Sequence, residues 1–234
     1  AMVFVLYDCL VQRRQDKVMA TAKRTNAIVS SLFPSNVRDR ILKDAEEQAE
    51  QDMLNNKKGF FSAAPKNRLK SFLDEDNVAG AHAFDTKPIA DLFPHATVMF
   101  GDIVGFTAWS SVREPSQVFT LLETVYHAFD EIAKRRRVFK VETIGDCYVA
   151  VTGLPDPRKD HAVVMARFSR DALHKMNDLT KRLEVSLGPD TGDLSMRFGL
   201  HSGPVTAGVL RGDKSRFQLF GDTVNTAARI ESTG

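Results

Sequence analysis

Cysteine is scarce in this chain of 234 residues, where only Cys9 and Cys147 occur. Two distant cysteines exclude a disulfide framework and a cysteine-rich zinc module, and they suit a reducing compartment. An excess of one charge is also lacking, because 32 Lys and Arg residues against 30 Asp and Glu residues leave a formal net charge of +2. The basic run at 135–137 is expected to close a helix, where cations meet the carbonyl end. No nucleic-acid partner is therefore predicted.

A long hydrophobic run is missing as well, since no stretch reaches the roughly 18 apolar residues that a membrane-spanning helix requires. The chain nevertheless opens with the apolar residues 1–7 and soon reaches Arg13, Arg14 and Lys17. This opening is either the end of a transmembrane helix with its cations on the cytoplasmic side, or the start of an apolar helix that carries cloning residues. The first interpretation predicts membrane anchoring through an N-terminal segment outside this chain, with the remainder cytoplasmic.

Three regions differ in their patterns. Residues 1–43 are rich in helix formers with apolar residues spaced by seven, which predicts an N-terminal helical stalk; a two-helix coiled coil and a single helix packed on its own domain both fit. Residues 44–87 lose periodicity and hold few apolar anchors, which predicts a flexible linker or insertion. Regular apolar spacing returns in residues 88–234, where a folded domain is expected.

This last region predicts an α+β domain. The expected strands are 96–100, 138–144, 147–152, 196–201, 205–210 and 216–220, and the expected helices are 117–133, 161–187 and one that starts at 223. The order begins βαββα and continues with strands. It predicts a ferredoxin-like split βαβ core, in which an antiparallel sheet is flanked by helices.

An apolar run ends in Gly-Asp three times, at Asp102, Asp146 and Asp222. Carboxylate oxygens are ligands that Mg²⁺ shares with substrate phosphates, although an aspartate in a turn explains each of the three equally well in isolation. Asp222 stands where a helix should begin, which predicts a helix cap. After Asp102 the chain passes through Gly105 toward a helical region, whose free backbone N–H groups can bind a triphosphate.

Four motifs occur in order within residues 88–234. They are FGDIVGFT at 100–107, KVETIGD at 140–146, MRFGLHSG at 196–203 and FGDTVNTAAR at 220–229. Together they resemble class III adenylyl and guanylyl cyclases. The resemblance implies an enzyme that converts a purine nucleoside triphosphate to a 3′,5′-cyclic nucleotide and pyrophosphate. It also implies a homodimer with active sites shared across the interface, and a domain whose family pattern continues past Gly234 with a further triphosphate-contacting Lys.

The resemblance assigns roles residue by residue. Asp102 and Asp146 would hold two Mg²⁺ or Mn²⁺ ions, with the Ile103 carbonyl as an added ligand, for in-line attack of the ribose 3′-OH on the α-phosphate. Asn225 would orient the ribose, and Arg229 would stabilise the transferring phosphoryl group. The residues that would bind the triphosphate are Val104, Gly105, Phe106, Thr107 and Arg197.

Two positions that choose the purine in this family correspond to Glu142 and Gln218. A Glu142 carboxylate offers only acceptors, which suit N1–H and N2–H₂ of guanine and leave adenine N1 unpaired at a cost of about 1–3 kcal/mol. Gln218 departs from the family, which usually has Cys in guanylyl cyclases and Asp or Thr in adenylyl cyclases, and its amide can meet either base. The prediction is a guanylate cyclase; an adenylate cyclase and a non-catalytic regulatory dimerisation domain are the alternatives.

Overall fold

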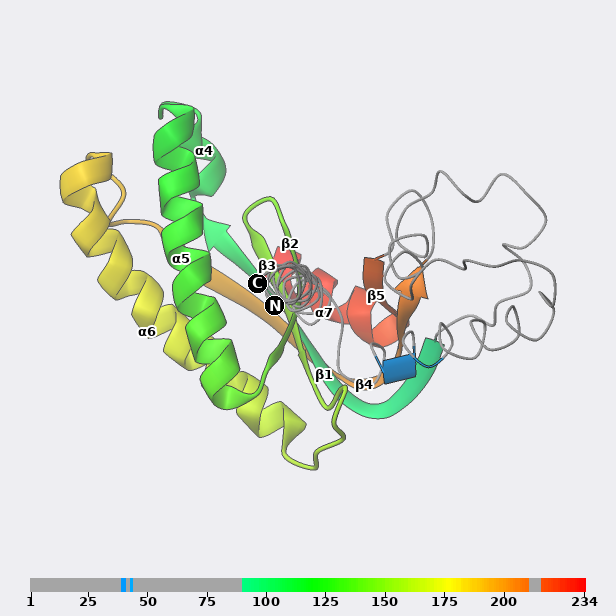
Figure 1. Ribbon diagram of the computed structural model, residues 1–234. Helices are drawn as coiled ribbons and strands as arrows, with labels where there is room; N and C mark the ends of the chain where they lie inside the picture. The colour runs from blue at the N-terminus through cyan, green and yellow to red at the C-terminus, as the bar shows by residue number, and fades with distance from the viewer. Residues whose placement is uncertain (1–38, 41–42, 44–89, 211–215) are drawn as a thin grey trace, which may run out of the picture. The chain divides into compact units, whose positions relative to one another are not determined.

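The computed structural model describes residues 39–40, 43, 90–210 and 216–234 (Figure 1). Residues 39–40 and 43 are helical. The rest of the expected stalk (1–43) and the whole expected linker (44–87) lie outside the described residues. In the ranges that are described, no helix combines the length and the hydropathy needed to cross a membrane.

One compact unit comprises Ala90–Ala207 and Gln218–Gly234. The elements from Ala90 onward follow one another in this order: β1 (Ala90–Val104), α4 (Phe106–Ser110), α5 (Pro115–Arg136), β2 (Phe139–Ile144), β3 (Cys147–Thr152), α6 (His161–Leu187), β4 (Ser195–Leu210), β5 (Arg216–Phe220) and α7 (Asp222–Thr233). The strands form a sheet in the order β2-β3-β1-β4-β5, and β3 pairs antiparallel with both β1 and β2. Because α5 links β1 to β2 and α6 links β3 to β4, the predicted split βαβ core is confirmed.

The two long helices α5 and α6 lie side by side against one face of this sheet (Figure 1). Strand residues that alternate toward this face meet apolar residues of the helices in one core. The largest fully buried members of that core are Met99, Ile103, Leu121, Phe129, Tyr148, Met165, Phe168 and Met176. Burial of these side chains supplies the main driving force for the fold.

The short helix α7 packs on the opposite face. A Cβ added at Gly199 would come within 2.3 Å of the Ala227 carbonyl oxygen, so only glycine lets the helix approach β4 this closely. Met196 and Phe198, the neighbours of Arg197 and Gly199 on alternating positions, join the core under α5 and α6. Alternation therefore directs Arg197 to the face that carries α7.

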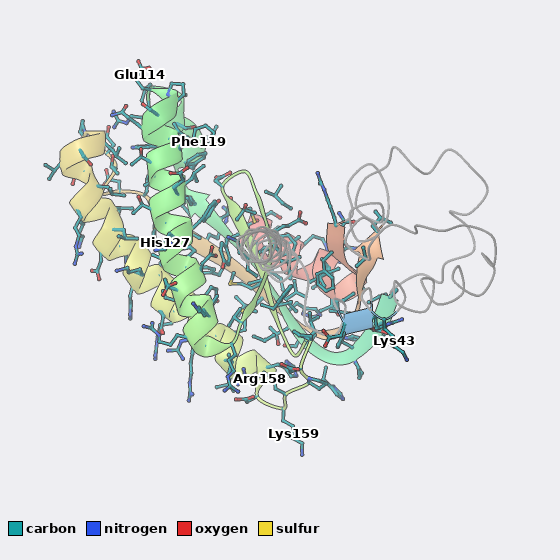
Figure 2. All side chains as sticks on the ribbon, viewed as in Figure 1. Lys43, Glu114, Phe119, His127, Arg158 and Lys159 are labelled. Carbon is teal, nitrogen blue, oxygen red and sulfur yellow. The ribbon has the colours of Figure 1, made fainter. Side chains whose placement is uncertain are left out.

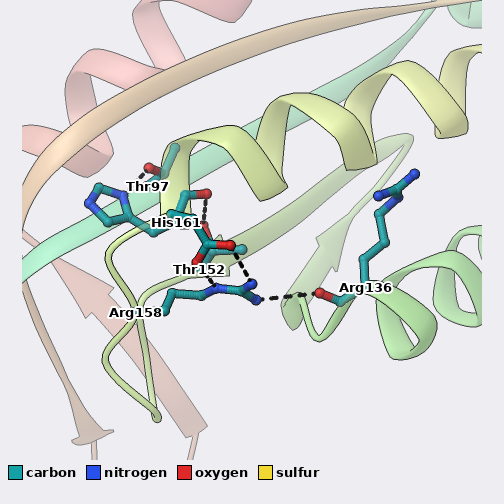
Figure 3. Close-up of polar contacts among 6 residues, drawn as sticks. Thr97, Arg136, Thr152, Arg158 and His161 are labelled. Atoms are coloured by element: carbon teal, nitrogen blue, oxygen red, sulfur yellow. Dashed lines mark hydrogen bonds and ion pairs between the residues drawn. The ribbon is translucent and has the colours of Figure 1, made fainter.

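Polar contacts tie the start of α6 to the sheet (Figure 3). The hydroxyl of Thr97 in β1 lies 2.7 Å from Nδ1 of His161. The same hydroxyl is 2.8 Å from the hydroxyl of Ser202. Thr152 in β3 donates a hydrogen bond of 2.8 Å to the His161 carbonyl. Since both threonines are buried, their hydroxyls need these partners, and the network holds α6 against β1 and β3.

The helix α5 is longer than the expected 117–133, by two residues at its start and three at its end, and the basic run closes it as expected. Glu114 is labelled at the start of the helix in Figure 2, and its backbone N–H donates a hydrogen bond of 3.2 Å to Oε1 of Gln117. Pro115 occupies the first helical position. Basic residues fill the last turn, where they face the carbonyl ends of the helix. Arg136 in that turn is further held by an ion pair with Asp171 of α6.

Two expectations about local structure are wrong. The strands expected at 196–201 and 205–210 form one continuous strand, β4, because the fixed φ of Pro204 is compatible with extended backbone. The cap predicted for Asp222 is also wrong: the N-cap of α7 is Gly221, and Asp222 lies in the first turn. There its carboxylate is 3.7 Å from the guanidinium of Arg229 and interacts favourably with the N-terminal end of the helix.

Candidate active site

Two carboxylates meet where β1 ends and β2 turns into β3. The register of β1 and β3 runs from Thr97 opposite Thr152 to Gly101 opposite Tyr148, which brings Asp102 beside the turn that contains Asp146. Burial and the neighbouring Asp146 carboxylate raise the pKa of Asp102, while Arg197 opposes the rise. The structure therefore brings together two of the predicted metal ligands, and their mutual repulsion favours a bound cation.

A tyrosine on α5 holds the turn that carries Asp146. The Tyr126 hydroxyl donates a hydrogen bond of 2.9 Å to the Gly145 carbonyl, and Gly145 adopts a left-handed conformation with φ of 62°. Burial, followed by the charge of Asp146, raises the pKa of Tyr126. The phenol therefore remains a donor throughout the neutral range. No pattern in the sequence singles out Tyr126.

Beneath this turn, Tyr148 and Lys140 share one carboxylate. Tyr148 donates to Asp130 at 2.8 Å, and the Lys140 ammonium lies 2.9 Å from the same carboxylate. The ammonium also lies 5.1 Å from the centre of the Tyr148 ring and 5.9 Å from that of Tyr126, within the range of a cation–π interaction. These contacts hold α5 against β2 and β3, the two strands joined by the turn that contains Asp146.

The segment that follows Asp102 has the predicted form. Ile103 is buried, Val104 is exposed, and Gly105 turns the chain with φ of 85° into α4. Phe106 and Thr107 begin this helix, and the first N–H groups of a helix have no partner within it. The segment lies directly beyond the carboxylate pair, at the position expected for a phosphate-binding loop.

This donor set fits a hard divalent cation. Two neighbouring carboxylates and the backbone oxygen at Ile103 provide only oxygen ligands, and Mg²⁺ typically takes one or two carboxylates together with substrate phosphates. Within the described residues, no group of three or more His, Cys, Asp or Glu side chains is placed to hold a metal. A pair of carboxylates completed by substrate phosphates is a typical Mg²⁺ site.

Arg197 lies between two carboxylates. Its Nη2 is 3.2 Å from Oδ2 of Asp102, and its Nε is 2.7 Å from Oε1 of Glu231 on α7. Hydrogen bonding by Glu231 raises the pKa of Arg197, which keeps the guanidinium charged. The predicted triphosphate ligand thus stands beside the predicted metal ligands. Glu231 was missed by sequence reasoning, because it lies two residues beyond the fourth motif, which ends at Arg229.

The two predicted base-reading residues share one cavity of about 170 Å³. A bulge in β2 explains how Glu142 reaches it: Lys140 pairs with Ala150 of β3, whereas Glu142 pairs with Val149, so Val141 is an extra residue. The remaining residues around the cavity, besides Glu142 and Gln218, are Phe100, Val141, Ile144, Val149, Leu219 and Val224. A small cavity with apolar walls and two polar side chains suits a planar heterocycle.

Asn225 and Arg229 lie on the exposed side of α7, one turn apart. The Arg229 side chain is 71% exposed and donates a hydrogen bond of 3.3 Å to the Thr226 hydroxyl. The two predicted transition-state residues therefore share a helix face, as their spacing predicts. That face is open to solvent, whereas Glu231 lies on the sheet side of the same helix.

Comparison with known proteins agrees with this geometry. Residues 90–234 match the family described as "Adenylate and Guanylate cyclase catalytic domain". The receptor-type guanylate cyclase gcy-28 of Caenorhabditis elegans is 38% identical over 231 residues, which cover 93% of this chain and 17% of that protein. Human retinal guanylyl cyclase 1 is 38% identical over 218 residues, which cover 91% of this chain and 18% of that protein. The chain thus spans less than a fifth of the length of these relatives.

Solved structures of similar domains give the same result. The guanylate cyclase domain of RhGC from Catenaria anguillulae, in complex with GTP, has a TM-score of 0.54 and 41% identity, covering 61% of this chain and 75% of that one. The catalytic core of a rhodopsin-guanylyl cyclase with converted specificity, in complex with ATPαS, has a TM-score of 0.55 and 41% identity, covering 62% and 74%.

Proposed function

The chain belongs to the adenylate and guanylate cyclase catalytic domain family, and we propose that it converts GTP to cyclic GMP and pyrophosphate. The observation that carries the proposal is the cavity in which Glu142 lies together with Gln218. Two carboxylate oxygens there can accept both N1–H and N2–H₂ of guanine, and Gln218 can donate its NH₂ to guanine O6. The relatives named as guanylate cyclases support the same choice.

The chemistry of the reaction follows from the carboxylate pair. Two Mg²⁺ or Mn²⁺ ions bound there supply Lewis-acid activation of the ribose 3′-OH and of the α-phosphate. Asp102 and Asp146 bind them as anionic ligands, and the Ile103 carbonyl adds a neutral one. Tyr126 keeps the turn of Asp146 in place, so the carboxylates are oriented before substrate arrives.

The triphosphate is bound by cations and amide donors near that pair. We assign this role to Arg197 and to the segment 104–107, comprising Val104, Gly105, Phe106 and Thr107. Asn225 orients the ribose, and Arg229 stabilises the charge that develops on the α-phosphate as pyrophosphate leaves. A planar guanidinium that is always charged suits both arginines to phosphate binding.

A homodimer completes the site in this proposal. Asn225 and Arg229 lie on the open face of α7, and their exposure supports a role toward a second copy of the chain. Each of two sites then takes its metal carboxylates from one protomer and its ribose and phosphoryl contacts from the other. The receptor-type relatives support membrane anchoring with this domain on the cytoplasmic side.

The test is the identity of the product. The protein is incubated with equal GTP and ATP and with Mn²⁺ or Mg²⁺, and the products are identified by mass spectrometry. We expect predominant cyclic GMP. Predominant cyclic AMP would show that Gln218 overrides Glu142 and that the protein is an adenylate cyclase. Absence of both products, with a dimer present in solution, would favour the regulatory dimerisation domain.

A further inference from the structure

Glu231 is more enclosed than Asp102, since its side chain is 12% exposed against 24% for Asp102, and none of the roles above involves it. Its Oε1 accepts the 2.7 Å hydrogen bond from Nε of Arg197. The other edge of that guanidinium reaches Asp102. A planar guanidinium with two carboxylate partners is held in a defined orientation.

The backbone around Glu231 is as constrained as its side chain. A Cβ added at Gly199 would come within 2.2 Å of the Glu231 backbone nitrogen and 2.6 Å of its Cβ. The helix α7 therefore packs directly on β4 at Gly199, two residues along the strand from Arg197. This packing gives the carboxylate little freedom to follow Arg197 elsewhere.

The side chains around Arg197 carry an excess of negative charge. Asp102, Asp146 and Glu231 contribute three carboxylates, and Arg197 is their one cation among the ion pairs of the described residues. The excess negative charge leaves the cluster suited to a divalent cation.

We propose that Glu231 is a positioning residue that retains Arg197 when Asp102 exchanges the guanidinium for a divalent cation. The inference rests on the function proposed above. In the structure Arg197 is paired with one oxygen of Asp102, so a cation that binds Asp102 competes with the guanidinium for this carboxylate. Glu231 then keeps Arg197 next to the metal, where the terminal phosphates are bound. Without Glu231, Asp102 is the remaining carboxylate partner of Arg197, which then competes more strongly with the cation.

Binding of Mn²⁺ in the absence of nucleotide tests this directly. Free Mn²⁺ is followed by its electron paramagnetic resonance signal during titration of the full chain. For Glu231→Gln we expect the Mn²⁺ dissociation constant to rise by about threefold or more, because a partly exposed ion pair has effects of this order. For Arg197→Gln we expect tighter binding than in the wild type. Glu123→Gln on the exposed side of α5 is the matched control and should bind as the wild type does.

The double variant separates positioning from charge alone. In the Arg197→Gln background, Glu231→Gln should have little further effect, since it acts through Arg197. If it weakens Mn²⁺ binding equally with and without Arg197, Glu231 acts only by its charge and the proposal is wrong. The proposal is also overturned if Arg197→Gln fails to tighten binding, a result that does not depend on the folding of any Glu231 variant.

Turnover gives a second readout. Glu231→Gln should raise the KM for GTP and the Mn²⁺ concentration for half-maximal rate more than it lowers kcat, and Glu231→Asp should restore part of the loss. An unchanged KM with a reduced kcat would contradict the role. The binding measurements do not require catalysis, so the two proposals can fail separately. If the Mn²⁺ dissociation constants shift as predicted but no cyclic nucleotide forms, the proposed function is wrong and the role of Glu231 stands.

Discussion

Replacing Tyr126 with Phe removes the hydroxyl that is hydrogen-bonded to the turn containing Asp146. The lost hydrogen bond to the Gly145 carbonyl, 2.9 Å long, has a net value of about 0.5–1.5 kcal/mol. If losing this hydrogen bond destabilises the productive orientation of Asp146 by the same free energy, kcat/KM for GTP falls by roughly twofold to twelvefold. The Mn²⁺ concentration for half-maximal rate should rise, since Asp146 is held less well.

Tyr148→Phe is the matched control, because it removes a hydroxyl that bonds Asp130 and not the turn. Both variants are assayed for cyclic GMP formation across Mn²⁺ concentrations and for thermal unfolding. We expect similar losses of stability and a metal-dependent defect only in Tyr126→Phe. The elevated pKa of Tyr126 further predicts that the ratio of wild-type to variant activity is constant from about pH 6 to 9. Equal Mn²⁺ dependence in the two variants would refute a positioning role for Tyr126.

Five other substitutions test the site and the packing beside it. Asp102→Asn and Asp146→Asn should abolish turnover. Because the pKa of Asp102 is raised in the folded state, the charge of this carboxylate destabilises the fold at pH values above that pKa. The Asp102→Asn variant should therefore unfold at an equal or slightly higher temperature than the wild type at pH 7, measured by calorimetry. Glu142→Lys combined with Gln218→Asp inverts the donor pattern and should move the ratio of cyclic GMP to cyclic AMP toward cyclic AMP by about tenfold or more; an unchanged ratio would reject Glu142 as the base reader. Gly199→Ala should lower the free energy of unfolding by about 2–4 kcal/mol in denaturant titrations, since its Cβ would overlap the backbone of α7.

The sequence predicts most of this fold because local signals are strong in the catalytic region. Alternating and 3.6-residue apolar patterns place β3, α6 and β5 with the bounds that the structure shows. The break expected within β4 fails because Gly203 and Pro204 are compatible with extended backbone as well as with turns. Similarly, Asp222 satisfies a composition rule for caps, yet the backbone geometry makes Gly221 the cap.

The sequence selects the residues of the candidate site, whereas it does not predict how they are arranged. A two-residue repeat would place Lys140 and Glu142 on the same face of β2. The bulge at Val141 instead turns Lys140 toward Asp130 of α5 and Glu142 toward the cavity on the other face. No residue type in the motif marks that bulge, since it depends on how β2 and β3 align over several residues.

The helix α7 shows why this arrangement has consequences beyond one protomer. Its sheet side presents Glu231 to Arg197, next to Asp102 of the same protomer, one of the proposed metal ligands. Its open side presents Asn225 and Arg229. In the proposed dimer these two sides serve different active sites. Asn225, Arg229 and Glu231 belong to the same helix, so any shift of α7 on loss of the Arg197–Glu231 ion pair would move all three together. Cation binding at one site is then linked to the placement of ribose and phosphoryl ligands at the other, and Glu231→Gln should alter the cooperativity of GTP turnover as well as its KM.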